Sequence, residues 1–249
     1  MPRCPQPAQR RLRRSGRAPH NRCMCGRYKI VTDAQALYDA FQVEAELNAA
    51  SLERYNVAPA TDQLVILSEG GHRVARWHRW GLIPHWAKDK TIGYKTINAR
   101  GESVALKPAF RAAFRQRRCL VPATGFYEWK VLAGGKQPYL IRLNGGELFS
   151  FAGLWETWTG PEGEVRSFTI ITTEPNELMA RIHDRMPAII PRAQYARWLD
   201  PALHDPVELQ AMIASYPAKE MQAVPVSAKI NSARNQGAEL IEPAGEPLA

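Results

Sequence analysis

Short apolar stretches separated by turn signals are the clearest pattern in the middle of the chain. The stretches are rich in β-branched and aromatic residues, which is typical of strands. Between them stand Gly134-Gly135, Asn144-Gly145-Gly146 and Gly160-Pro161-Glu162-Gly163, and each of these segments suits a tight connection. We therefore predict strands over residues 118–121, 126–131, 139–143, 148–155 and 166–172.

Helical periodicity and further strand signals flank this central region. Asp33 followed by Leu37, Tyr38 and Phe41 predicts a capped amphipathic helix. A helix over residues 102–116 is expected to bend or break at Pro108. Shorter helices are expected over residues 173–182, 194–199 and 207–215, further strands over 64–67, 74–80 and 221–226, and a long loop over 81–101.

These elements predict an α+β fold with one domain, in which short helices flank a central antiparallel, barrel-like β-sheet. No repeat or low-complexity linker divides residues 24–249. The pattern does not show whether the barrel closes. We expect residues 1–23 to be a basic disordered arm, residues 24–243 to be the domain, and residues 244–249 to be a flexible tail.

The positive charge of the chain is concentrated at its start. The formal net charge is +9, from 33 basic and 24 acidic residues. Residues 1–23 hold seven arginines and no acid, so 26 basic and 24 acidic residues leave the rest of the chain at +2. Two interpretations of the arm remain open: it tethers nucleic acid, or it lies upstream of a true start at Met24.

The cysteines and the absence of common motifs exclude several classes of protein. Cys4, Cys23, Cys25 and Cys119 form no CxxC spacing, so neither a disulfide framework nor a structural zinc site is indicated. A reducing, cytoplasmic compartment fits this usage. No apolar stretch is long enough to cross a bilayer. The P-loop, GxGxxG, GxSxG and HExxH motifs are absent, which disfavours nucleotide-driven motors, Rossmann enzymes and serine hydrolases.

Four short segments carry residues suited to chemistry. They are Met24-Cys25-Gly26-Arg27, Thr96-Ile97-Asn98-Ala99-Arg100, Gly125-Phe126-Tyr127-Glu128-Trp129 and Ile182-His183-Asp184-Arg185-Met186-Pro187. Taken singly, each segment has a structural explanation. A cysteine can be a small buried hydrophobe, an asparagine can cap a turn, a glutamate can face solvent, and a histidine beside an aspartate can be a helix-terminal charge pair.

Together, these segments resemble the SOS-response-associated peptidase (SRAP) family, whose members shield abasic sites in single-stranded DNA. The resemblance runs from Met24 to about Pro243. It also includes Arg54-Tyr55-Asn56-Val57-Ala58-Pro59, Trp80-Gly81-Leu82-Ile83-Pro84 and Asn235-Gln236-Gly237-Ala238-Glu239-Leu240. The resemblance implies the SRAP fold.

The resemblance also implies a covalent mechanism at Cys25. After removal of Met24, Cys25 would offer a free amine and a thiol two carbons apart, which can close a thiazolidine on the aldehyde of an abasic sugar. At an α-amino pKa near 8, roughly a tenth of the amine is neutral at pH 7. By the same resemblance, Glu128 handles protons on the amine and thiol, His183 assists sugar ring opening, and Asn98 orients Cys25. No metal or organic cofactor is implied.

The expected DNA contacts are local. Arg27, Arg100 and Arg185 each flank one of the chemical segments and would hold phosphates. Trp86 is the candidate for stacking against a base, whereas Trp77 and Trp80 on a strand are expected in the core. Asn56 and Pro59 would line the groove. The expected partner is single-stranded DNA containing abasic sites, bound by a monomer that associates with the bacterial nucleoid and not with a membrane.

The arm is the departure from the family. If translation starts at Met1, the nitrogen of Cys25 is in a peptide bond and cannot close the ring. A start at Met24, self-cleavage before Cys25 or cleavage by a protease would each free it.

Two other functions remain open at this stage. The first is a thiol peptidase with Cys25 as nucleophile and His183 as base, and the second is a non-catalytic reader of single-stranded or modified DNA. A weak lyase activity would accompany the crosslinking function.

Overall fold

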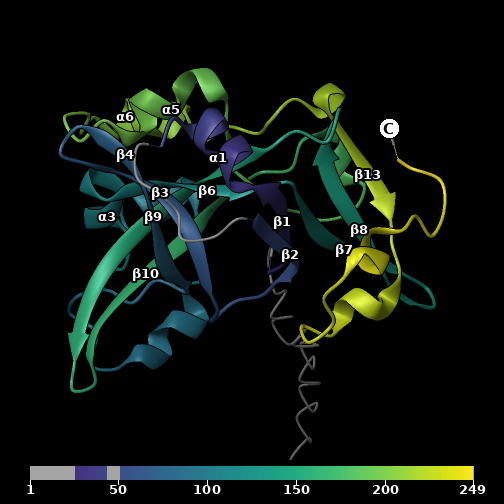
Figure 1. The fold of residues 1–249 in the computed structure, drawn as a ribbon, viewed down its shortest axis with the longest axis horizontal. Coiled ribbons are helices and arrows are strands. Elements are labelled where there is room, and N and C mark those ends of the chain that lie inside the picture. Colours follow the sequence, from purple (N-terminus) through teal and green to yellow (C-terminus); the bar gives the residue numbers. More distant parts are fainter. Residues whose placement is uncertain (1–25, 44–50, 249) are drawn as a thin grey trace, which may run out of the picture.

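The computed structural model describes residues 26–43 and 51–248 (Figure 1). The predictions for the arm over residues 1–23 and for Cys25 lie outside the described residues. Among the described residues, no helix has both the length and the apolar character needed to span a membrane.

Five strands close into a barrel at the centre of the described chain. Strand β3 (Asp62–Glu69) pairs with β4 (His72–Trp80), β4 with β10 (Gly163–Thr173), and β10 with β9 (Phe149–Gly160). Strand β9 then pairs with β6 (Arg118–Ala123), which pairs back to β3 and completes the ring. The predicted barrel is therefore confirmed. The β4–β10 pairing is parallel, because these strands are joined by a long connection and not by a hairpin.

A second sheet of five strands stands beside the barrel (Figure 1). Its order is β13 (Met221–Pro225), β8 (Gly135–Leu143), β7 (Gly125–Leu132), β1 (Tyr28–Asp33) and β2 (Ser51–Val57), with every pairing antiparallel. The sequence predicted β7, β8 and β13 but not β1 or β2. Three short strands extend the barrel sheet: β5 (Asn98–Arg100) and β11 (Met186–Pro187) beside β10, and β12 (Ile189–Ile190) beside β9.

Short helices surround the two sheets. Helix α1 (Ala34–Phe41) begins at Asp33, whose carboxylate accepts a hydrogen bond from the Ala36 N–H, as the predicted cap requires. The predicted helix around Pro108 is interrupted there, as expected. The remaining helices are α2 (Gly101–Val104), α3 (Arg111–Gln116), α4 (Glu177–Ala180), α5 (Tyr195–Leu199), α6 (Pro206–Ala211) and the 3₁₀ helices η1 (Lys90–Lys95), η2 (Arg192–Gln194), η3 (Ala218–Glu220), η4 (Ala228–Asn231) and η5 (Ala238–Ile241).

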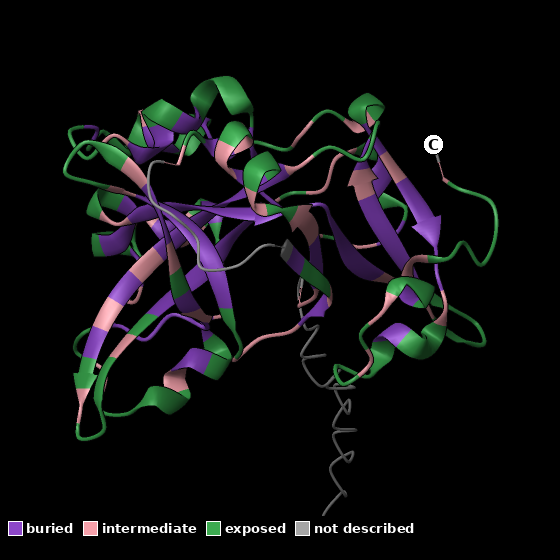
Figure 2. Ribbon diagram, in the orientation of Figure 1, coloured by how far each residue is buried: buried purple, intermediate pink, exposed green. Residues whose placement is uncertain are grey.

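One apolar core joins the barrel to the second sheet, and buried positions run along both (Figure 2). The Trp80 ring packs against Tyr28 with centroids 5.3 Å apart and stacks on Phe168 at 6.2 Å. Cys119, in β6, is also fully buried. A smaller cluster covers the opposite face of β7 and β8 and consists of Tyr127, Leu140, Val226, Ile230 and Leu240.

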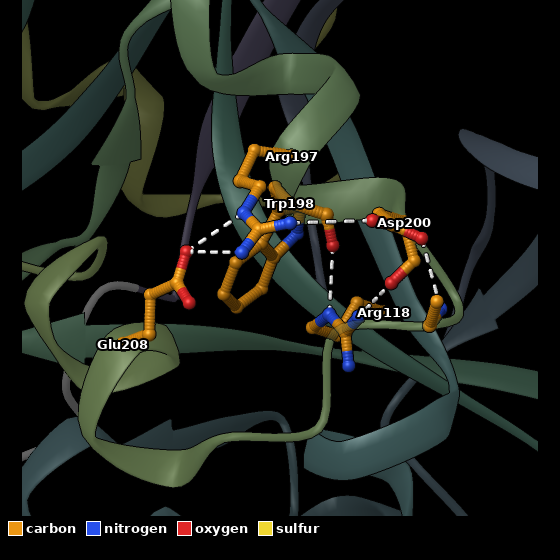
Figure 3. Close-up of polar contacts among 6 residues, drawn as sticks. Arg118, Arg197, Trp198, Asp200 and Glu208 are labelled. Atoms are coloured by element: carbon orange, nitrogen blue, oxygen red, sulfur yellow. Dashed lines mark hydrogen bonds and ion pairs between the residues drawn. The ribbon is translucent and has the colours of Figure 1, made fainter.

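A buried arginine ties helix α5 to the barrel (Figure 3). Arg118, 5% exposed, donates from Nε to the Trp198 carbonyl at 2.7 Å and from Nη1 to the Phe114 carbonyl at 3.0 Å. Its guanidinium lies 5.8 Å from the centre of the Trp198 ring. Burial lowers the pKa of Arg118 to about 10, so the group remains charged at neutral pH.

The end of the chain differs from its prediction. Residues 244–249 were expected to be a flexible tail, but Leu248 and Ala223 exchange backbone hydrogen bonds of 2.8 and 3.2 Å. The Ala244 N–H also donates to the Pro225 carbonyl. Strand β13 is an edge strand, and its exposed backbone groups give residues 244–248 a partner that a hydropathy pattern does not reveal.

Two glycines allow the loop after β4 to cross itself closely. Gly81 has φ +123°, and a Cβ there would lie 2.5 Å from the Gly93 carbonyl oxygen.

We expect Gly81→Ala to lower the free energy of unfolding by about 2 kcal/mol or more, because it combines backbone strain with a clash against the backbone of Gly93. Urea denaturation measures the change. Gly134→Ala is the control, because that position is open and has no positive φ, and a loss as large there would contradict this account.

A buried histidine in β4 makes stability depend on pH. His78 is 1% exposed and meets the Trp155 ring edge-on at 5.8 Å. Burial, with a smaller effect of Arg166, lowers the pKa of His78 from 6.5 to about 4. As the pH falls, His78 therefore becomes protonated in the unfolded chain at a higher pH than in the folded protein. The stabilisation from neutral His78 is full above about pH 6.5 and is lost as the pH falls towards 4.

We expect His78→Phe to reduce this loss, because phenylalanine keeps the ring contact and cannot be protonated. Urea unfolding at pH 7 and at pH 4.5 should show a smaller drop in the variant, by on the order of 3 kcal/mol. His72→Phe, at the exposed start of β4, should behave as wild type. An equal drop in His78→Phe and wild type would show that His78 does not control this loss.

Candidate active site and nucleic-acid interface

Strand β10 brings two of the four chemical segments together. Strand β5 runs parallel to it, with Asn98 opposite Ile170 and Arg100 opposite Thr172. On the other side of β10, β11 pairs Pro187 with Thr172. The segments around Asn98 and around His183 therefore meet at the carboxyl end of one barrel strand, on either side of Thr172.

Strands β1 and β7 bring together the other two segments. Tyr28 lies opposite Phe126, and the Tyr127 N–H donates to the Arg27 carbonyl at 3.0 Å. Side chains alternate along a strand, so Glu128 shares the face of Phe126, which packs into the main core. Glu128 is 1% exposed, and its carboxylate is therefore enclosed beside the strand that follows Cys25.

Trp80 connects the two pairs of segments. Its ring packs on Tyr28 of β1, and its indole N–H donates to the Ile97 carbonyl at 2.8 Å, one residue before Asn98. Trp80 thus links the segments on β1 and β7 to the Asn98 segment, which in turn meets the His183 segment across β10. Asn98 is half-buried at this junction.

His183 has partners for both of its protonation states. Its Nδ1 accepts a hydrogen bond from the Arg185 N–H at 3.1 Å, which suits a neutral ring with its hydrogen on Nε2. The same Nδ1 lies 3.2 Å from an Asp184 carboxylate oxygen, which suits the protonated ring. The side chain is 10% exposed. A group held in this way can both give and take a proton.

The predicted phosphate-binding arginines differ in their surroundings. Arg100 is exposed. Arg185 donates to a Glu102 carboxylate oxygen at 2.7 Å and to the Thr172 carbonyl at 2.8 Å, and its side chain is 12% exposed. Partial burial acts to raise the pKa of Glu102, but its own backbone N–H, the hydrogen bond from Arg185, and the charges of Arg185 and Arg100 together lower it. Glu102 is thus a carboxylate held between two arginines.

The half-buried Arg27 contacts the buried Asn56. Arg27 Nη1 donates to the Asn56 Oδ1 at 2.8 Å and to the Ile230 carbonyl at 3.0 Å. Asn56, predicted to line the DNA groove, is 1% exposed and therefore offers almost no surface to a ligand.

The remaining predicted contacts are more accessible. Pro59 is half-buried, and Trp86 is 51% exposed in the loop after β4. Trp80 is in the core as expected, but Trp77 is 45% exposed, so the core prediction is wrong for Trp77.

Sequence reasoning missed the residues that support the site. Glu102 and Thr172 accept hydrogen bonds from Arg185. The only sign of this arrangement in the sequence was an acidic residue two positions after Arg100. Gln236 stood in a quoted motif without a role, and its side chain bonds to the backbone of Asn56. No group of three or more metal-binding side chains occurs within residues 26–43 and 51–248.

Comparison with known proteins gives consistent matches over most of the chain. A family model described as SOS response associated peptidase (SRAP) matches residues 24–233. The chain is 45% identical over 222 residues to the abasic site processing protein YoqW of Bacillus subtilis, covering 88% of this chain and 99% of that protein. It is 33% identical over 213 residues to the abasic site processing protein HMCES of Xenopus tropicalis, covering 73% of this chain and 63% of that protein.

A solved structure has the same fold. The crystal structure of a protein from Bacteroides thetaiotaomicron superimposes with a TM-score of 0.80 at 26% identity, covering 88% of this chain and all of that one. The barrel and the second sheet therefore form a known fold, and the chain belongs to the SOS-response-associated peptidase (SRAP) family.

Proposed function

We propose that this protein recognises abasic sites in single-stranded DNA and crosslinks to them through a thiazolidine at Cys25. The observation that carries the proposal is that strand pairing joins the Arg27 segment to the Glu128 segment and the Asn98 segment to the His183 segment, and that Trp80 connects the two pairs. The relatives named abasic site processing proteins support the choice of substrate. Crosslinking would shield the lesion during the response to DNA damage.

The reaction begins with the sugar. An abasic deoxyribose is mostly a closed hemiacetal, and the crosslink needs its open aldehyde. Ring opening breaks the C1′–O4′ bond while the C1′ hydroxyl loses its proton, and O4′ takes up a proton. His183 suits this step, because a protonated ring held beside the Asp184 carboxylate can give its Nε2 proton to O4′, and the neutral ring can then take the proton from the C1′ hydroxyl.

The amine and the thiol of Cys25 then add in turn. The amine attacks the aldehyde carbon, and loss of one water leaves an imine. The thiol sulfur adds to the same carbon, its proton passes to the nitrogen, and a five-membered ring closes. The enclosed Glu128 carboxylate would carry these protons, and Asn98 would orient the cysteine. Elimination from the imine, which breaks the C3′–O3′ bond and releases the phosphate at that end, would give weak lyase activity. Reversal by the same steps would release the protein and the intact abasic DNA.

Cys25 must have a free amine for this reaction. We propose translation from Met24 followed by removal of that methionine, and the match of the family model from residue 24 supports this start. Self-cleavage before Cys25 would give the same product and would be the peptidase activity of this protein.

DNA would be held by a local set of contacts. Arg100 and Arg185 flank Thr172 and would bind phosphates on either side of the lesion. Arg27, also predicted to bind phosphate, would instead act beside the nucleophile, because its guanidinium is bonded to Asn56 and to the Ile230 carbonyl. Trp86 would stack on a base, and Pro59 would line the groove.

Intact-mass spectrometry tests the crosslink directly. We expect protein made from Met24 to form a stable adduct with single-stranded DNA carrying one abasic site, with the summed mass of both minus one water. Cys25→Ala should form no stable adduct. Uncleaved protein made from Met1 should also form none, because its Cys25 nitrogen is an amide. A stable adduct on that uncleaved form, or none on the Met24 form, would overturn the mechanism.

The Glu102 carboxylate should weaken DNA binding, because it neutralises Arg185 and lies near Arg100. We expect Glu102→Gln to tighten binding of abasic-free single-stranded DNA by about threefold or more at low salt. The difference in DNA affinity between Glu102→Gln and wild type should shrink at high salt. Fluorescence anisotropy measures the affinity of each protein at both salt concentrations.

Glu208→Gln is the matched control for this measurement. Glu208 forms a similar ion pair with Arg197, at 2.7 Å, on helices α5 and α6 (Figure 3). This variant should bind DNA as wild type does. Unchanged or weaker binding by Glu102→Gln would exclude Arg185 as a phosphate ligand that Glu102 competes for.

A further inference from the structure

The side chain of Arg27 is fixed against the C-terminal part of the chain. Its Nη1 donates to the Asn56 Oδ1 at 2.8 Å and to the Ile230 carbonyl at 3.0 Å, and its Nη2 donates to the Asn231 carbonyl at 3.3 Å. Its own carbonyl accepts from the Tyr127 N–H. The backbone of Arg27 is therefore held by β7. Its guanidinium is held by residues about two hundred positions further along the chain.

Asn56 binds the same C-terminal segment from the other side. Its Nδ2 donates to the carbonyls of Ile230, Ser232 and Asn235, at 3.2, 2.9 and 3.1 Å. Its Oδ1 accepts from Arg27. The amide thus uses its oxygen for Arg27 and its nitrogen for residues 230–235, and it joins the two.

Gln236 closes the arrangement. Its Oε1 accepts from the Asn56 N–H at 3.1 Å, and its Nε2 donates to the Asn56 carbonyl at 2.9 Å. The side chain of Gln236 therefore pairs with the backbone of β2 as a neighbouring strand would. The edge of β2 is covered there by one glutamine.

The C-terminal segment is anchored independently of these contacts. Ile230 and Leu240 pack into the smaller apolar cluster with Tyr127. The Trp129 indole N–H donates to the Asn231 Oδ1 at 2.7 Å. Figure 1 shows this yellow segment beside β7 and β8. Residues 230–236 are thus a firm support on which Arg27 and Asn56 can be held.

We propose that Arg27, Asn56 and residues 230–236 form a C-terminal clamp that positions the amine and thiol of Cys25. This inference rests on the proposed function. Cys25 is two residues before Arg27, so their Cα atoms are at most about 7 Å apart. With Arg27 fixed at both its backbone and its guanidinium, few torsions remain between the clamp and the reacting atoms. Asn56 and Gln236 are positioning residues.

The burial of Asn56 distinguishes this role from a DNA contact. A side chain that is 1% exposed has no surface for a phosphate or a base. A misplacement of about 1 Å at a reacting group can slow a reaction about a hundredfold. Loosening the clamp should therefore lower the rate of crosslinking and leave DNA affinity almost unchanged.

The test compares variants of protein made from Met24 under single-turnover conditions. The rate of crosslinking to abasic single-stranded DNA is measured over a range of DNA concentrations. For Gln236→Ala we expect the limiting rate to fall about 10- to 100-fold, with the half-saturating DNA concentration within about twofold of wild type. Asn56→Ala should have a larger effect of the same kind. If Asn56→Ala does not fold, the limiting rate of Gln236→Ala alone decides whether the clamp acts in this way.

Gln137→Ala is the matched control. Gln137 donates from Nε2 to the Val226 carbonyl at 3.0 Å, at the start of the same C-terminal segment. This variant also loses a glutamine–backbone hydrogen bond. We expect its thermal stability to fall about as much as that of Gln236→Ala, and its limiting rate to stay at the wild-type value.

A small aldehyde separates this inference from the proposed function. An N-terminal cysteine forms a thiazolidine with glyoxylate in solution without any DNA site. The Gln236→Ala, Asn56→Ala and Gln137→Ala variants should therefore react with glyoxylate at the wild-type rate. No adduct with glyoxylate in wild type would mean that Cys25 has no free amine, and the proposed function would fail. Wild-type limiting rates in Gln236→Ala, or a changed half-saturating concentration alone, would overturn the clamp and leave the proposed function intact.

Discussion

The arrangement of the candidate site depends on the contacts that the Trp80 side chain makes. Its ring packs on Tyr28 of the second sheet and on Phe168 of the barrel, and its N–H holds the Ile97 carbonyl. Trp80 is 1% exposed, so this donor would be unsatisfied if the loop moved away, and an unsatisfied buried donor is expensive. The packing that closes the core therefore also fixes where Asn98 stands relative to the strand that follows Cys25.

Much of the fold could be predicted because the strands in the middle of the chain, in both sheets, carry local signals. Residues 118–172 alternate apolar runs with glycine turns, and each predicted strand there exists. Strands β1 and β2 were missed because Lys29, Glu53 and Arg54 make them look polar, although Lys29 is 9% exposed and bonds to Thr124 through its ammonium. A pattern of hydropathy does not show that a long side chain is buried along its stem.

The residues proposed for the candidate site stand in local motifs, whereas the residues that hold them in place do not. Asn98, Glu128 and His183 stand in short motifs that can be recognised locally. The contacts of Asn56 reach residues 174 to 180 positions away, and no local pattern encodes them. Asn56 was therefore interpreted as a groove residue, whereas it is buried. The same limit applies to Glu102 and Arg185, which are 83 positions apart.

In the proposed reaction an N-terminal cysteine needs little help to react with an aldehyde, so the main task of this fold would be placement. Good orientation can raise the effective concentration of a reacting group to 10⁵ M or more, on the order of 7 kcal/mol. The scaffold fits that task, because β7 holds the backbone of Arg27, two residues after the proposed nucleophile, and the C-terminal segment holds the Arg27 side chain. Most of the excess charge lies in residues 1–23. If the proposed reaction takes place, its specificity for an abasic site should therefore depend on positioning of the amine and thiol more than on the net charge.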